Sequence, residues 1–286
     1  MKTYLKCIPC FVKQALSVAE ISFDDDRDIK DLLDKVGCRI KDIDMSFTPP
    51  EMGMIIYDEL NKITGIDDPY AQEKAAHIKE AKRLYPMLKE RLSKADDPLL
   101  MAIRIAIAGN VMDLGMDKKF HVEKDLEHIL QQDFAICDYQ AFKEVLEKSE
   151  EVLYLGDNSG ESVFDKILIE ELKIPVTYVV RGKPVINDVT YDDAVASGLD
   201  EVAEIISSGT PAPATILRLC NDDFLRRFNK ATIIIAKGQG NYEGLSETDR
   251  PVFFLLKAKC PVIAEDIGVK EDDIVCKYAL KNKRGQ

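Results

Sequence analysis

The stretch Val152–Leu172 constrains the fold of this chain more than any other part of the sequence. It opens with an apolar run that ends at Leu155, passes through the polar turn Gly156–Glu161, and closes with apolar residues at helical spacing. This order predicts a buried strand, a tight turn and an amphipathic helix within 21 residues. In an open α/β sheet, such a turn lies at the carboxyl end of a strand, where these folds bind their ligands.

The polar residues of this turn indicate what kind of ligand it suits. The helix that follows offers unpaired N–H groups and the positive end of its dipole, which favour an anion. Asp157 and Asn158 add hard oxygen ligands, so the pattern favours a divalent cation that holds a phosphate. Taken alone, Asp157, Asn158 and Ser159 also fit a simple turn that caps the helix. The glycine spacing matches neither the dinucleotide fingerprint GxGxxG nor the phosphate loop that ends in Gly-Lys-Ser/Thr.

Length, composition and charge limit the class of protein. The 286 residues suffice for one large domain or two, and 46% apolar with 31% charged residues is typical of a soluble globular protein. A formal net charge of −12 argues against a nucleic-acid backbone or an anionic membrane as the main partner, but not against a small phosphorylated substrate. Lys2, Lys6 and Lys13 interrupt any signal-peptide core, and Pro98–Leu114 is too short and polar to span a bilayer. We therefore expect a cytoplasmic protein.

The seven cysteines are scattered and odd in number, so we do not expect a framework of structural disulfides. Cys7 and Cys10 form a CxxC motif, which serves as a redox pair, as half of a zinc site, or as two inert thiols. No second CxxC and no nearby histidine completes a zinc site. A redox or regulatory role and an inert role remain as alternatives.

Residues 7–147 show the pattern of consecutive helices, with prolines at several expected helix starts. One of these helices begins at Pro98, and its apolar face ends in the polar segment Gly109–Asp113. Asn110 and Asp113 either point into a cleft, or Asn110 only caps the helix.

After residue 148 strand-like runs alternate with helices, which indicates βαβ units and a parallel sheet with helices on both faces. The runs are Val152–Leu155, Val176–Val180, Ala231–Ala236 and Val252–Leu256. We predict an α/β protein with an all-helical domain at residues 1–148. Residues 149–286 are expected to form a Rossmann-like three-layer α/β/α domain with a mainly parallel sheet, and the site is expected in the cleft between the two.

Two further polar clusters follow predicted strands, at residues 181–190 and 237–243. Together with the turn after Leu155, they share one edge of a parallel sheet, which strengthens the prediction of a site. The position of Asp188 depends on the path of its segment. If residues 183–187 pair back as a hairpin, Asp188 lies at the wrong end of the sheet; if the segment is an excursion near the carboxyl end, Asp188 joins the site.

The chain also resembles the DUF89 family, described as damage-control phosphatases with an ARMT1-like metal-binding fold. The resemblance covers essentially the whole length and is carried, in order, by CIPCFVKQAL, AGNVMDLG, LGDNSGESVFDK, INDVTYDDA, TPAPATILRLC and AKGQGNYEGLSE. The CxxC is similar to that of the stand-alone prokaryotic and archaeal subfamily. The resemblance implies a metal-dependent phosphatase for small phosphometabolites (sugar phosphates, nucleotides or damaged derivatives).

The resemblance also implies roles for single residues. It implies metal ligands, which are also the catalytic residues, at Asp157, Asn158 and Asp188. It implies a substrate- and phosphate-binding set at Lys237, Gly238, Gly240, Glu161, Asn110 and Asp113. The expected metal is Mn²⁺, Ni²⁺, Co²⁺ or Mg²⁺, and water is expected to attack the phosphorus in line, with Asp157 nearest to the reacting centre.

Two other classes of function stay open. One is a methyltransferase that uses S-adenosylmethionine, an activity also attributed to part of the family, although no glycine-rich loop with a ribose-binding acid about 20 residues later is evident. The other is a non-catalytic regulator that binds a metal or nucleotide, with Cys7 and Cys10 as its redox input.

Overall fold

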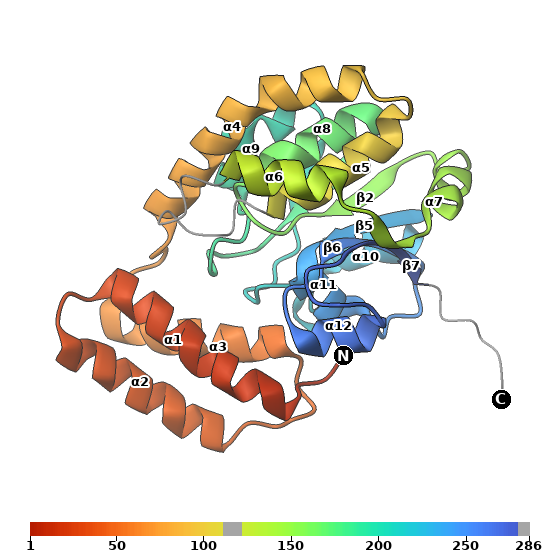
Figure 1. Cartoon of the computed structure of the whole chain (residues 1–286). Coiled ribbons are helices and arrows are strands. Elements are labelled where there is room, and N and C mark those ends of the chain that lie inside the picture. Colours follow the sequence, from red (N-terminus) through yellow and green to blue (C-terminus); the bar gives the residue numbers. More distant parts are fainter. Residues whose placement is uncertain (111–121, 280–286) are drawn as a thin grey trace, which may run out of the picture.

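A seven-stranded sheet forms the centre of the protein, of which the computed structural model describes residues 1–110 and 122–279 (Figure 1). The strand order is β1-β7-β6-β5-β2-β3-β4, and every neighbouring pair is parallel except β6 with β7. The strands are β1 (Phe134–Cys137), β2 (Val152–Leu155), β3 (Val176–Val180), β4 (Glu204–Ser207), β5 (Ile233–Lys237), β6 (Val252–Lys257) and β7 (Ile274–Ala279). The predicted α/β class with a mainly parallel sheet is confirmed.

The strands that the sequence predicts are the buried ones. β2 and β3 have the predicted bounds, and β5 and β6 differ from their predicted bounds by one or two residues. All residues of β2, β3 and β5 are buried, so each strand is a continuous apolar run. The sequence did not predict β1, β4 and β7, because β1 and β4 are four-residue edge strands and β7 is half-exposed along its second half.

Helices cover both faces of the sheet. The α-helices of the described residues are α1 (Ile8–Ser22), α2 (Asp26–Lys41), α3 (Pro49–Thr64), α4 (Ala71–Ser93), α5 (Pro98–Ala108), α6 (Val122–Gln131), α7 (Tyr139–Leu146), α8 (Ser162–Leu172), α9 (Tyr191–Ser197), α10 (Asp222–Lys230), α11 (Gly238–Leu245) and α12 (Pro261–Ile267). One apolar core joins α4, α5, α6, α8 and α9 to one face, and a second core joins α10, α11 and α12 to the other. This is the predicted three-layer arrangement.

The first three helices form a layer of their own beside the sheet (Figure 1). Their shared core contains Phe11 and Val18 of α1, Leu32 of α2 and Met52 of α3. Val185, from the segment that follows β3, is 2% exposed and packs into the same core. The helical layer is therefore attached to the carboxyl edge of the sheet by an apolar contact.

The segment before residue 148 contributes more than this layer. β1 is part of the sheet, and α4, α5 and α6 pack in the core of its first face. The expected boundary between two domains, at residues 148 and 149, stays a prediction. The expected helix start at Pro98 is confirmed, and the Asp97 carboxylate accepts a hydrogen bond from the Leu100 N–H (3.1 Å).

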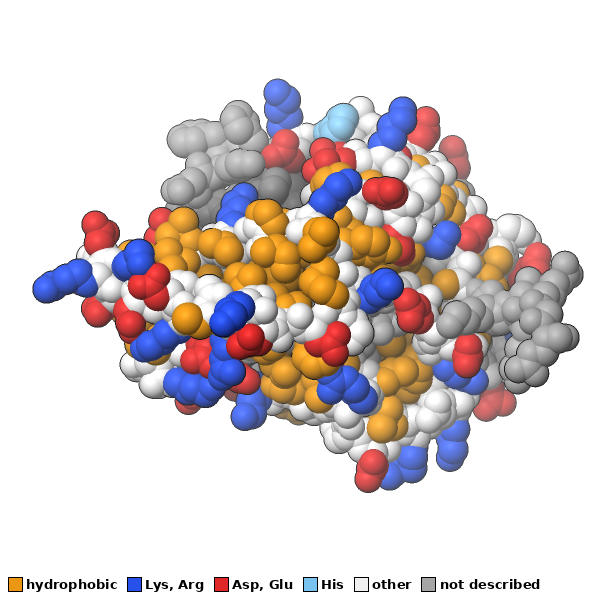
Figure 2. Space-filling model, turned by 90° about the horizontal axis from the view of Figure 1, so that it is seen from below, with side chains coloured by type: hydrophobic (Ala, Val, Ile, Leu, Met, Phe, Trp, Pro, Cys, Tyr) orange, Lys and Arg blue, Asp and Glu red, His pale blue; other side chains and the backbone are white. Residues whose placement is uncertain are grey.

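We next consider whether any described helix could cross a membrane and where apolar side chains are exposed. None of the helices at residues 1–110 and 122–279 combines the length and the apolar character needed to cross a bilayer. Figure 2, which views the molecule from below, shows hydrophobic side chains gathered near the middle of this face among charged ones. The exposed large apolar side chains of α1 are Val12, Leu16 and Ile21.

Gly182, directly after β3, packs closely against the backbone of Gly209, and a substitution can test this packing. A Cβ at Gly182 would lie 2.6 Å from the backbone carbon and oxygen of Gly209, which cannot move aside as a side chain could. We expect Gly182→Ala to lower the free energy of unfolding by about 1–3 kcal/mol in urea titration. Gly37→Ala, on the exposed side of α2 with nothing within 4 Å, is the control and should raise it by about 0.5–1 kcal/mol. Equal effects at the two positions would contradict this packing.

Candidate active site

Three segments that follow strands meet at the carboxyl edge of the sheet. β2 lies between β3 and β5, so the chain moves outward from β2 on one side and returns to its other side, and this switch point is where open α/β sheets bind ligands. The segment after β3 is an excursion that stays at this edge. Asn158 and Asp188 form an antiparallel bridge, and the Val189 N–H donates to the Asp157 carbonyl oxygen (2.8 Å). The hairpin alternative therefore does not hold, and Asp188 lies beside Asp157 and Asn158.

A cavity of about 470 Å³ opens over these residues, between the sheet edge and the helical layer. Its sheet side includes Asp157, Asn158 and Asp188, and its opposite wall includes Lys13 and Gln14 of α1. The three residues expected to bind metal thus share one cavity that a small molecule can enter.

Arg181 lies behind the two aspartates and was not predicted. Its guanidinium is fully buried, its Nε donates to Asp188 Oδ2 at 2.6 Å, and its Nη2 lies 3.7 Å from Asp157 Oδ1. Within the described residues, Nη1 and Nη2 have no hydrogen-bond partner. Arg181 therefore holds the two carboxylates together by charge.

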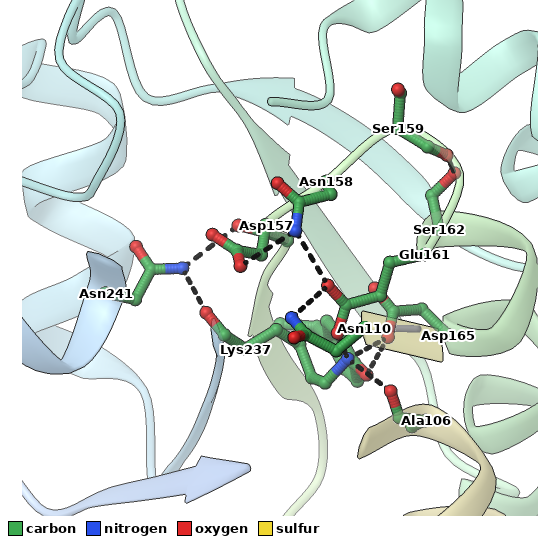
Figure 3. Close-up of polar contacts among 12 residues, drawn as sticks. Ala106, Asn110, Asp157, Asn158, Ser159, Glu161, Ser162, Asp165, Lys237 and Asn241 are labelled. Atoms are coloured by element: carbon green, nitrogen blue, oxygen red, sulfur yellow. Dashed lines mark hydrogen bonds and ion pairs between the residues drawn. The ribbon is translucent and has the colours of Figure 1, made fainter. Parts of the chain in front are cut away.

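Lys237 occupies a different place from the one its sequence position suggests. A lysine at the end of a strand can project over the sheet edge, but the Lys237 ammonium is fully buried and points towards α5 and α8 (Figure 3). It donates to the Ala106 carbonyl oxygen (2.8 Å), to Asp165 Oδ1 (2.7 Å) and to Glu161 Oε1. Burial alone would lower the pKa of Lys237, but the charges of Asp165 and Glu161 outweigh it and raise the pKa. The predicted phosphate contact of Lys237 stays a prediction, and its three donors already have acceptors.

Asp165 is a second buried charged residue that the sequence did not reveal. It is fully buried in the first turn of α8 and accepts hydrogen bonds from Tyr154 (2.7 Å) and Tyr178 (2.9 Å) as well as from Lys237. Burial and the Asp165 charge raise the pKa of both tyrosines, so they stay protonated and donate. An acidic residue between Phe164 and Ile167 is the only signal in the sequence.

Asp157 is in strongly unfavourable surroundings for a lone carboxylate. Burial raises the pKa of Asp157, the neighbouring Glu161 and Asp188 raise it further, and Arg181 and Lys259 act in the opposite direction. The Asn158 amide donates to both Asp157 Oδ2 and Glu161 Oε2 at 3.3 Å, so its N–H side faces the carboxylates and its oxygen faces away (Figure 3). A cation beside Asp157 would keep this carboxylate ionised.

Comparison with known proteins identifies the family of this chain. The family model described as the damage-control phosphatase ARMT1-like domain matches residues 3–275. The chain belongs to this family. It is 35% identical to a damage-control phosphatase of Pyrococcus horikoshii (99% of both chains) and 34% identical to one of Archaeoglobus fulgidus (97% of this chain, 99% of the other).

A solved structure supports the same assignment. The crystal structure of a DUF89 family protein from Pyrococcus horikoshii matches with a TM-score of 0.89 and 32% identity, over 97% of this chain and 99% of that one. The fold and the phosphatase function that the sequence predicts are therefore confirmed at the level of the family.

Two glycines of the family motif after β5 allow a close approach to the site. Gly238 has φ +74°, and a Cβ there would lie 1.7 Å from Asp157 Oδ2. A Cβ at Gly240 would lie 2.5 Å from the Pro213 carbonyl oxygen. Only glycine fits at these positions, because the backbone itself forms the wall beside Asp157.

Two further predicted phosphatase residues, Glu161 and Asn110, lie behind the cavity. Glu161 is 1% exposed, and Asn110, also buried, approaches its Oε2 at 3.5 Å. Asp113 lies outside the residues that the structure describes. Glu161 and Asn110 are thus neighbours of the site's carboxylates and do not form part of the cavity wall.

The two cysteines of the CxxC differ in their surroundings. Cys10 is exposed and lines the cavity, whereas Cys7 is half-buried and burial raises the pKa of its thiol. Within the described part of the chain, no group of three or more His, Cys, Asp or Glu side chains is arranged to hold a metal. Cys10 of the CxxC therefore lines the cavity, and the redox alternative stays a prediction.

Lys237→Met should destabilise this phosphatase strongly. The change leaves Glu161 and Asp165 buried without their cation, and breaking such a buried pair costs about 3–5 kcal/mol. Denaturant unfolding followed by circular dichroism measures the loss. Lys230→Met, at the exposed end of α10, is the control and should change stability by no more than about 0.5 kcal/mol. A loss below about 1 kcal/mol at Lys237 would show that the pair is not a main support of the fold.

Proposed function

We propose that the protein is a metal-dependent phosphatase that hydrolyses phosphomonoesters of small metabolites, and that Asp157, Asn158 and Asp188 hold the metal. The observation that carries this proposal is a connected group of buried charges, here called the buried charge cluster. It consists of the carboxylates Asp157, Glu161, Asp165 and Asp188 and the cations Arg181 and Lys237. With every carboxylate ionised, the cluster has two more negative than positive charges, which is the charge that one divalent cation balances.

The donor set suits such a cation. Two carboxylates and one amide oxygen are hard ligands, which Mg²⁺ and Mn²⁺ favour, and Co²⁺ and Ni²⁺ also accept oxygen ligands. The Asn158 amide donates to Asp157 and Glu161 through its nitrogen, and its oxygen would be the atom that binds the cation. When bound, a divalent metal supplies positive charge that polarises the phosphoryl group of a substrate.

The protein's own groups then orient the reaction. Arg181 fixes Asp188 and lies close to Asp157, so both carboxylates keep one position relative to the cavity. The amino end of α8 follows the Asp157–Asn158 turn and adds the positive end of its dipole where a phosphate binds. Asp157 is nearest to the reacting phosphorus, and water attacks in line to release inorganic phosphate and an alcohol.

The size and lining of the cavity support a small polar substrate. About 470 Å³ suffices for a sugar phosphate or a nucleotide. The helical wall presents Lys13, Gln14 and Ser17, which can hydrogen-bond hydroxyl groups of the part that leaves. We therefore assign the phosphate end of the substrate to the sheet edge and the remainder to α1.

Removal of one predicted ligand tests the metal site directly. Asp157→Asn, Asn158→Ala and Asp188→Asn should each lower phosphate release by roughly 10²-fold or more, because each removes a ligand or a charge at the reacting centre. Release from a panel of sugar phosphates and nucleotides is measured with Mg²⁺, Mn²⁺, Co²⁺ or Ni²⁺, and with EDTA. Calorimetry measures Mn²⁺ affinity and circular dichroism measures the fold.

The control for these variants is Asp192→Asn, on the exposed side of α9, which should match wild type. If wild-type protein releases phosphate equally well in EDTA, the metal dependence is wrong. If it releases none with any metal, binding of S-adenosylmethionine in a thermal-shift experiment decides between the methyltransferase and the regulator.

The cysteines test the regulatory alternative. Under reducing conditions, Cys7→Ser combined with Cys10→Ser should leave turnover within about twofold of wild type, because hard metals bind oxygen rather than thiolate. Phosphate release and Mn²⁺ affinity are compared for the two proteins. A parallel loss of turnover and of bound Mn²⁺ in the double variant would assign the thiols to the metal site.

A further inference from the structure

Among the described residues that line the cavity, Glu243 is the acidic one that the proposed metal site does not use. It lies in α11 and is largely buried, yet it forms part of the cavity wall. A carboxylate repels the phosphoryl group of a substrate, because both carry negative charge. A role for Glu243 in substrate binding therefore has to involve another part of the substrate.

One carboxyl oxygen of Glu243 is held by the protein, and the other is left for a ligand. Oε1 accepts a hydrogen bond from Gln239 Nε2, one turn earlier in α11 (2.9 Å). The backbone carbonyl oxygen of Glu243 accepts another from the amino group of Met1 (2.8 Å). Within the described part of the chain, Oε2 makes no hydrogen bond. The cavity wall thus contains an acceptor whose position is fixed and which has no donor from the protein.

Gln239, which also lines the cavity, already uses both ends of its amide. Its Nε2 donates to Glu243 and to Cys260 Sγ (3.7 Å), and its Oε1 accepts from the backbone N–H of Lys259 (3.1 Å). Gln239 therefore orients the Glu243 carboxyl, and Glu243 is the side chain of this pair that can bind a ligand.

The position of Glu243 along α11 places it beside the part of the substrate that leaves. α11 begins at Gly238, where a Cβ would lie 1.7 Å from Asp157 Oδ2, so the start of this helix adjoins the reacting end of the cavity. Glu243 follows Gly238 after somewhat more than one helical turn, about 7 Å further along the helix axis. Gln14 and Ser17 of α1 line the same cavity. Polar groups from two helices thus surround the space beyond the phosphate.

The chemistry of the Glu243 carboxyl suits a hydroxyl group. Burial raises the pKa of Glu243 to about 7, although the hydrogen bond from Gln239 and the N-terminal ammonium act in the opposite direction. Near neutral pH the carboxylate and the neutral acid are therefore both present. A hydroxyl group pairs with either form, because it can both donate and accept a hydrogen bond.

We propose that Glu243 determines substrate specificity by binding a hydroxyl group of the leaving part through Oε2. The substrate class is then a phosphate ester of a polyol, with a hydroxyl group close to the ester. This proposal rests on the proposed phosphatase function and adds a specificity-determining residue to it. An ester with an apolar leaving part would leave the largely buried Oε2 without a donor, which costs binding free energy.

The experiment compares glycerol phosphate with propyl phosphate, which has the same carbon chain without the hydroxyl groups. Phosphate release is measured with saturating Mn²⁺, and the readout is the ratio of the kcat/KM values for these esters. Wild-type protein should prefer glycerol phosphate by roughly tenfold or more, the scale of one hydrogen bond to a charged group.

Glu243→Gln should lower this ratio by roughly tenfold. The Gln239 amide still needs an acceptor, so the new side chain turns its oxygen to Gln239 and its N–H₂ group to the cavity. An N–H₂ group cannot accept a hydrogen bond from a hydroxyl group. Glu271→Gln, exposed and outside the cavity, is the matched control and should keep the wild-type ratio.

A wild-type ratio near one overturns the assignment, and this result needs no variant. An equal loss of activity on both esters in Glu243→Gln also overturns it, because a purely structural role has that effect. A preference for aminopropyl phosphate that Glu243→Gln removes would show that the carboxylate binds an ammonium group instead. Failure of the proposed function has another signature, namely no phosphate release from either ester with any metal. In that case the calorimetric Kd values of the esters decide whether Glu243 favours the hydroxyl groups.

Discussion

The buried ammonium of Lys237 connects the sheet to the helices that form its first face. Lys237 ends β5, and Ala106 lies in the last turn of α5. Glu161 directly precedes α8, and Asp165 lies in its first turn. The last carbonyl groups of a helix have no partner within the helix and attract a cation. One side chain thus satisfies the end of α5 and neutralises charge at the start of α8. The bond from Lys237 to Glu161 therefore also helps to fix the Asp157–Asn158 turn, which shortly precedes Glu161.

Arg181 is the second buried cation of the site, and it pairs with Asp157 and Asp188. Arg181 directly follows β3, and its Nε donates a hydrogen bond to Asp188, seven residues later in the segment that stays at the sheet edge. Between them, Val185 is inserted into the core of the α1–α3 layer. The excursion therefore joins three things at once: the sheet edge, the carboxylates and the helical layer that roofs the cavity. A movement of the α1–α3 layer would therefore shift Asp188 through the short segment that joins it to Val185.

The sequence predicts the parts of this site that local pattern encodes. Apolar runs followed by polar residues located β2, β3 and β5, and with them Asp157, Asn158 and Gly238. Asp188 was identified as a candidate, but only the chain path after β3 decides where it lies. Lys237 was identified too, but the direction of its side chain depends on strand packing. Arg181 was missed, because a charged residue just after a strand is usually at the surface.

The full burial of Lys237 follows from what its ammonium does in the fold. A cation that holds a fold together gains from full burial, because the low dielectric strengthens its bonds, and it loses if any donor is withdrawn. A cation that binds substrate must bond to the ester, then to the product, and then release it, so it cannot be committed to fixed protein acceptors. Lys237, with its ammonium on three acceptors, fits the first requirement.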